Sequence, residues 1–90
     1  MIINKKLKEA DVLCNVIGDM TFREAADYLN DGIPELYKRT HQSVFNWFTG
    51  GNKMPGAVAD ALTRYYPEDD DRHQLGKVIL QMREKAAEAQ

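Results

Sequence analysis

The sequence predicts a compact all-α fold of five helices. Apolar residues recur at the three- and four-residue spacing of amphipathic helices along most of the chain. No segment shows the alternation of apolar and polar residues that is typical of a half-buried strand. The chain has 90 residues, 43% hydrophobic and 29% charged. This length supports one hydrophobic core and argues against a second independent domain.

The first helix is expected between Lys5 and Ile17. Its apolar positions have helical spacing and are Leu7, Ala10, Leu13 or Cys14, and Ile17. Gly18 is a plausible end of this helix. Cys14 has apolar neighbours, so we expect it on the apolar face of the helix. Because it is the single cysteine, it cannot form an intramolecular disulfide, which favours a reducing, cytoplasmic compartment.

The second helix is expected to begin after Thr21. Glu24 follows three residues later, and this spacing is typical of a capping box, in which each side chain accepts a hydrogen bond from the other residue's backbone. The expected buried stripe of this helix is Phe22, Ala25, Ala26 and Leu29.

A connection of about ten residues follows, from Asn30 to Arg39. Asn30-Asp31-Gly32 is a turn signal, and Pro34 can begin but not continue a helical turn. We therefore expect a single helical turn at most between Ile33 and Arg39, with Leu36 and Tyr37 covering the core.

The third helix is expected at 41–49, with Thr40 as its N-cap. Val44, Trp47 and Phe48 have the inward spacing. Four polar residues remain on the outside, namely His41, Gln42, Ser43 and Asn46. Gly50 and Gly51 end this helix.

Two more helices complete the fold. Pro55 suits the first turn of the fourth helix, which Pro67 ends, and its inward residues are Val58, Ala59, Leu62 and Tyr65 or Tyr66. The acidic run 68–71 favours the N-terminus of the last helix, from Arg72 to Ala87. Its apolar stripe is Leu75, Ile79, Met82 and Ala86, with Val78 as an alternative to Ile79. This stripe has two possible roles, a dimer contact or closure of the monomer core. We divide the chain into a body at 1–66 and an acidic turn with a helix at 67–90.

Charge is unevenly distributed along the chain. Residues 1–66 hold eight basic and eight acidic residues, and residues 67–90 hold four and six, which gives the net charge of −2. The sequence therefore lacks the overall basic character of most nucleic-acid-binding proteins. Positive charge is concentrated locally at Lys5, Lys6 and Lys8, and at Lys38, Arg39 and Lys53. The first group is interpreted as a solvated helix face, with contact to a DNA backbone as the alternative.

Catalytic, metal and membrane functions are not expected. A chain of this length rarely supports both a deep pocket and the residues that hold catalytic groups in place. The only soft metal ligands, Cys14, His41 and His73, fall on three separate helices. We expect no cofactor, no metal and no small-molecule substrate. There is neither a signal-peptide pattern nor an apolar run of membrane-spanning length.

Residues 40–55 carry the strongest functional signal. The third helix begins with short or planar polar side chains, which can form hydrogen bonds with base edges when a helix N-terminus enters the major groove of DNA. Gln42 suits the N6 and N7 atoms of adenine, and Asn46 follows one turn later. The alternative interpretation is that the polar side chains of the third helix form an exposed surface with no role in binding.

This segment resembles the recognition helix and following loop of the lambda-repressor/Cro-like helix-turn-helix regulators of phages. The matching features are Val44, Trp47 and Gly50 at the fourth, seventh and tenth positions after Thr40, then a basic residue and Pro55. Residues 21–29 are similar to the first helix of that motif, and the resemblance covers 21–66. The long connection at 30–39 departs from the family's tight turn. A weaker similarity links 67–90 to the lysogeny-establishment activators of lambdoid phages, in which a helix after the motif serves oligomerisation.

The resemblance implies a homodimeric regulator from a phage or prophage that binds a double-stranded DNA operator. It implies base contacts from His41, Gln42, Ser43 and Asn46. It implies phosphate contacts from Thr40, Thr49, Asn52 and Lys53, with Lys38 and Arg39 placed to add more. The implied dimer element is the stripe Leu75, Ile79, Met82 and Ala86. The alternative function is a protein-binding module, such as an antirepressor or a host-factor inhibitor, that kept the helical body and lost DNA binding.

Overall fold

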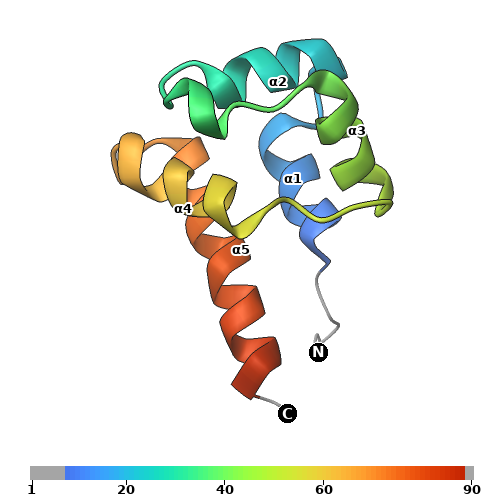
Figure 1. Ribbon diagram of the computed structural model, residues 1–90. Coiled ribbons are helices and arrows are strands. Elements are labelled where there is room, and N and C mark those ends of the chain that lie inside the picture. Colours follow the sequence, from blue (N-terminus) through green and yellow to red (C-terminus); the bar gives the residue numbers. More distant parts are fainter. Residues whose placement is uncertain (1–7, 89–90) are drawn as a thin grey trace.

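The structure, a computed structural model, describes residues 8–88 and is built from five α-helices (Figure 1). These are α1 (Glu9–Ile17), α2 (Phe22–Asn30), α3 (His41–Thr49), α4 (Gly56–Tyr65) and α5 (Asp71–Glu88), with one 3-10 turn, η1, at Glu35–Tyr37. No strand occurs between residues 8 and 88, so the all-α prediction with five helices is confirmed. Within this part of the chain no helix combines the length and apolar character needed to cross a membrane.

One hydrophobic core is shared by all of the longer elements. In Figure 1, α1 lies behind the centre, α2 and α3 lie above and beside it, and α4 packs on α5. The largest fully buried side chains come from α1, α3, the segment before α4, α4 and α5, and α2 adds the fully buried Ala25. They are Leu13, Val44, Met54, Leu62, Leu75, Ile79 and Ile17. The fold is therefore closed by contacts between segments that are far apart in the sequence.

The two N-terminal helices begin with local capping bonds. The Glu24 N–H donates to Thr21 Oγ1 (3.1 Å) and the Thr21 N–H donates to Glu24 Oε1 (2.9 Å), which confirms the predicted capping box. In α1 the Lys8 N–H donates to Asp11 (3.1 Å), and the helix begins at Glu9. The expected start at Lys5 lies outside the described residues, as do Lys6 and Leu7.

The predicted apolar face of α1 is wrong at one position. Cys14 is exposed, while Val12, Leu13 and Ile17 are buried. Tertiary packing causes this difference, because α1 packs against both α3 and α5 with the side that carries Val12. Cys14 lies about 200° from Val12 around the helix axis, at 100° per residue, and so faces solvent.

The long connection between α2 and α3 returns to its starting point. The Asn30 side chain accepts a hydrogen bond from the Arg39 N–H (3.0 Å) and donates one to the Arg39 carbonyl (2.7 Å). Inside this loop, Tyr66 Oη accepts from the Gly32 N–H (2.7 Å) and donates to the Leu29 carbonyl (2.9 Å). The ten-residue connection therefore ends beside the last residue of α2.

The helical turn expected in this connection is present as η1, but it is oriented differently from the prediction. Tyr37 is half-buried and its ring lies 6.3 Å from that of Tyr65. Leu36 is 76% exposed, so the expectation that it covers the core is wrong. The reason is that η1 packs against α4 through Tyr37, whose neighbour Leu36 faces outward.

The last helix closes the monomer core through two residues of the stripe predicted for dimerisation. Leu75 and Ile79 are 1% and 0% exposed, so neither side chain is available to a second copy. Met82 is half-buried against the core and Ala86 is exposed. The reason is that α5 packs along α4, where a Cβ at Gly76 would meet the Ala59 carbonyl oxygen and lie 2.9 Å from Leu62 Cβ.

Candidate nucleic-acid interface

Both ends of α3 are fixed by the residues that the sequence places there. Thr40 Oγ1 accepts a hydrogen bond from the Ser43 N–H (3.3 Å), as predicted for an N-cap. Gly50 has a φ of 83° and ends the helix in the left-handed conformation, which glycine adopts at low cost. The first turn of α3 contains no acidic residue, so the positive end of its dipole is left without a carboxylate from its own turn.

The inner side of α3 holds it rigidly on the body. Val44 and Trp47 are 1% and 5% exposed, and Phe48 is half-buried, as the sequence predicts. The ring centroids of Phe48 and Phe22, the first residue of α2, are 5.3 Å apart. These contacts fix the direction in which the outer side of α3 points.

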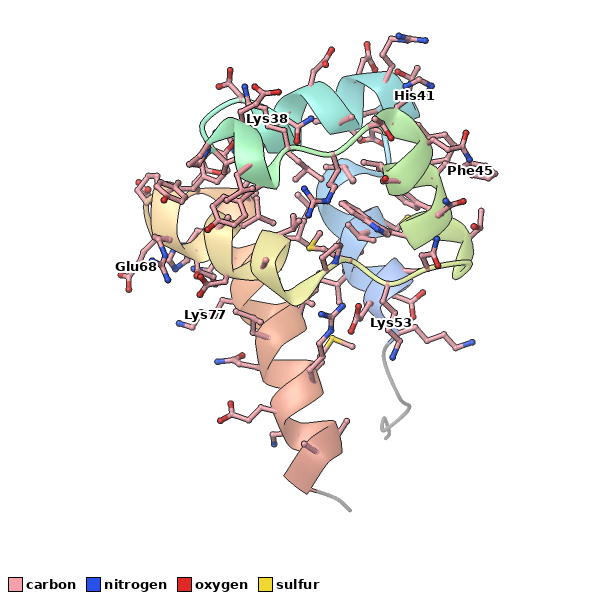
Figure 2. All side chains as sticks on the ribbon, viewed as in Figure 1. Lys38, His41, Phe45, Lys53, Glu68 and Lys77 are labelled. Carbon is pink, nitrogen blue, oxygen red and sulfur yellow. The ribbon has the colours of Figure 1, made fainter. Side chains whose placement is uncertain are left out.

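The outer side of α3 forms one continuous stripe along the helix axis. Its exposed residues are His41, Gln42, Phe45 and Thr49, whose spacing of three to four residues places them on one face. Ser43 and Asn46 were expected outside and are half-buried at the edge of this face. Figure 2 shows His41 at one end of α3, Phe45 projecting outward along it, and Lys53 beyond the other end.

The loop after α3 is held by two hydrogen bonds to one backbone carbonyl. The Thr49 hydroxyl donates to the Asn46 carbonyl (3.3 Å), and the same carbonyl accepts from the Asn52 N–H (3.2 Å). These bonds turn the chain back toward α3 and place Asn52 and Lys53, both exposed, next to its C-terminal end. Lys53 forms no ion pair within residues 8–88.

The two basic residues before α3 are already engaged. Lys38 Nζ lies 3.5 Å from Glu35 Oε1, in an exposed pair. Arg39 donates from its guanidinium to the carbonyls of Leu36 (3.2 Å) and Lys38 (3.0 Å). Of the basic N-terminal group, Lys8 is exposed, and Lys5 and Lys6 lie outside the described residues. Lys53 is therefore the predicted phosphate-binding cation with the fewest competing contacts.

Two exposed residues at this face were not singled out from the sequence. Phe45 is 40% exposed in the middle of the α3 stripe. Arg23 is exposed at the start of α2, next to Phe22, whose ring contacts both Phe45 and Phe48. The signal that could have found Phe45 is its spacing, because it lies four residues from both His41 and Thr49.

A shallow cleft of about 390 Å³ opens beside this face, between α1, the loop after α3 and the last turns of α5. Arg83 forms part of its wall, where it binds the Glu9 carboxylate through two bonds (2.7 and 2.8 Å) and donates to the Met54 carbonyl (2.6 Å). The pairing with Glu9 raises the pKa of Arg83. Lys53 lies on the rim of this cleft, and Met82 and Ala86 line it.

A second arginine–carboxylate pair lies away from α3, at the start of α5. Arg72 sits between the rings of Tyr28 and Tyr66, 4.3 and 4.0 Å from their centroids, and binds Asp70 through two of its nitrogens (2.7 and 2.8 Å). These bonds lower the pKa of Asp70 to about 2 and raise that of Arg72. Burial raises the pKa of Tyr28. Because Arg72 also donates to the Tyr28 carbonyl (3.0 Å), this cluster joins α2 to α5.

The fold and this face define a small all-α protein whose third helix is rigidly anchored and presents polar side chains along its outer side. No family model, no curated protein and no solved structure matches the chain.

Proposed function

We propose that this protein is a sequence-specific regulator of transcription that binds double-stranded DNA, with α3 in the major groove. The observation that carries the proposal is the construction of α3, which is capped by Thr40, anchored by Val44 and Trp47, and exposes hydrogen-bonding side chains on the opposite side. A rigid helix of this kind presents polar groups to base edges without first ordering them.

The roles of individual residues follow from their exposure. Gln42, fully on the outer side, is placed to pair with the N6 and N7 atoms of adenine, and His41 and Asn46 extend the same face. Lys53 supplies a phosphate contact by charge, at the end of α3 opposite His41 (Figure 2). The remaining hydrogen-bonding residues suited to bases or phosphates are Ser43, Thr40, Thr49 and Asn52.

We further propose that the protein binds DNA as a homodimer. One α3 with few free cations gives weak binding, whereas two copies on half-sites about 10 base pairs apart multiply affinity and specificity. Figure 1 shows the C-terminal part of α5 projecting from the body. Because Leu75 and Ile79 are in the core, we assign the dimer contact to the C-terminal end of the apolar stripe of α5, at Met82 and Ala86.

The proposal is tested by selecting bound duplexes from a random DNA library and measuring their affinity for variants. Lys53→Glu should weaken binding to all duplexes, and Gln42→Ala should relax the preference at one base pair at a cost of about 1–3 kcal/mol for the preferred site. The matched control is Lys77→Glu, which makes the same charge change on α5, at the edge of the molecule opposite α3 in Figure 2, and should leave binding unchanged. Failure to enrich any duplex with folded protein would overturn the proposal.

One observation favours the alternative, a protein-binding module on the same helical body. Leu36 is 76% exposed on η1, and Tyr65 is 44% exposed at the end of α4, the helix that η1 contacts. Lys38 and Arg39 are held by contacts within their own loop. An exposed apolar residue on a closed loop is suited to a protein contact. If the protein is such a module, Leu36→Ala would abolish binding of the partner protein. Lys53→Glu would leave both partner binding and the behaviour of the protein toward DNA unchanged.

A further inference from the structure

We propose that Phe45 is a specificity-determining residue that contacts the C5-methyl group of a thymine in the major groove. This inference rests on the proposed function and names the base that this part of the site selects. The first observation is position: Phe45 is 40% exposed, and it lies between Gln42 and Thr49 on the outer stripe of α3. Any duplex that contacts this stripe meets the phenyl ring (Figure 2).

The second observation is that the Phe45 ring is held in place. The ring of Phe22 lies 5.1 Å from it, centroid to centroid, at an interplanar angle of 88°. Phe22 is itself fixed against Phe48, with centroids 5.3 Å apart. An edge-to-face contact of this kind is favourable and restricts the rotation of the ring. Phe45 therefore presents an apolar surface with a defined position, at the level of the polar groups of α3.

The choice of thymine follows from the chemistry of the major groove. The purine edges there present the polar groups N6, O6 and N7, and cytosine presents an amino group, whereas thymine adds an apolar methyl group. A phenyl ring that covers a polar edge would leave its donors and acceptors without hydrogen bonds. The position of the thymine is also defined. Gln42 and Phe45 are separated by about 4.5 Å along the helix axis, which corresponds to about one base pair.

The test replaces the thymines of the selected duplex, one at a time, with deoxyuridine, which lacks only the C5-methyl group. At one position in each half-site the replacement should weaken binding about fourfold, the effect of burying one methyl group. Phe45→Ala should bind the thymine and deoxyuridine duplexes equally. Tyr65→Ala removes an aromatic ring of similar exposure (44%) from the end of α4 and should keep the full fourfold difference.

The outcomes separate this inference from the proposed function. The role of Phe45 would be overturned, and DNA binding left intact, by two results obtained with a tightly bound selected duplex. The first is that deoxyuridine has no effect at any position, and the second is that its effect persists in Phe45→Ala. Enrichment of no duplex would overturn both. If Phe45→Ala does not fold, the unaltered protein still decides, because the methyl-sensitive thymine must lie about one base pair from the position at which Gln42→Ala relaxes the preference.

Discussion

The side chain of Asn30 is expected to determine how α3 is placed against α2. The change Asn30→Ala removes two part-buried hydrogen bonds to the backbone of Arg39, of 2.7 and 3.0 Å. Each such bond contributes about 1 kcal/mol net, so the free energy of unfolding should fall by about 2 kcal/mol. For a domain of this size, that loss lowers the Tm by roughly 8–16 °C.

The assay is urea unfolding followed by circular dichroism, together with hydrogen exchange of the Arg39 amide. The matched control is Asn52→Ala, in an exposed loop where the asparagine side chain forms no hydrogen bond within the described residues, and it should stay within about 0.5 kcal/mol of the unaltered protein. Exchange of the Arg39 N–H should accelerate only in Asn30→Ala. The reasoning is refuted if the two variants are equally stable and the Arg39 amide keeps its protection.

Two further variants test the packing of α5 and the charge at its start. Gly76→Ala should destabilise the protein by about 1–3 kcal/mol in urea unfolding, although alanine favours helices, because the new Cβ lies 2.9 Å from Leu62 Cβ. The control is Gly56→Ala, which should not destabilise the protein, because the atom nearest to its new Cβ is 3.9 Å away. Equal effects at both glycines would contradict the packing argument. The pKa of Asp70 is lowered to about 2 by Arg72, so its contribution to stability is complete above about pH 4 and is lost as the pH falls toward 2. The stability difference between the unaltered protein and Asp70→Asn should therefore shrink over this interval in acid unfolding curves, and a difference independent of pH would argue against the pair.

The parts of the fold that were predictable are those with local causes. The capping box of Thr21 and Glu24 and the cap of α3 at Thr40 each involve residues three apart, so the sequence contains both partners. The closure of the connection was not predictable, because Asn30 binds the backbone of a residue nine positions away. Asparagine before a turn is equally typical of a simple turn signal, so nothing in the sequence distinguishes the two uses.

The exposure of His41 and Gln42 was predictable from the sequence, whereas that of Phe45 and the partial burial of Ser43 and Asn46 were not. Four of the five residues from 44 to 48 are apolar, and a helix on the surface can bury only one side of this run. Which aromatic residue remains outside depends on the angle at which α3 lies on the body, and this angle is set by α1 and α2. For the same reason the sequence left the role of α5 open. The burial of Leu75 and Ile79 shows that this part of the stripe closes the core.

The distribution of charge bears on the proposed DNA-binding face of this protein, whose net charge is −2. Two arginines, Arg72 and Arg83, are paired with the carboxylates of Asp70 and Glu9, so each pair adds little net charge to the surface. Part of the acidic surplus lies around Glu68, on the edge of the molecule opposite α3 in Figure 2. On the α3 side, Lys53 and Arg23 are exposed. If the protein binds DNA as proposed, each protomer neutralises few phosphates, so the salt dependence of binding should be shallow. Affinity would then come from base contacts and from the proposed second half-site.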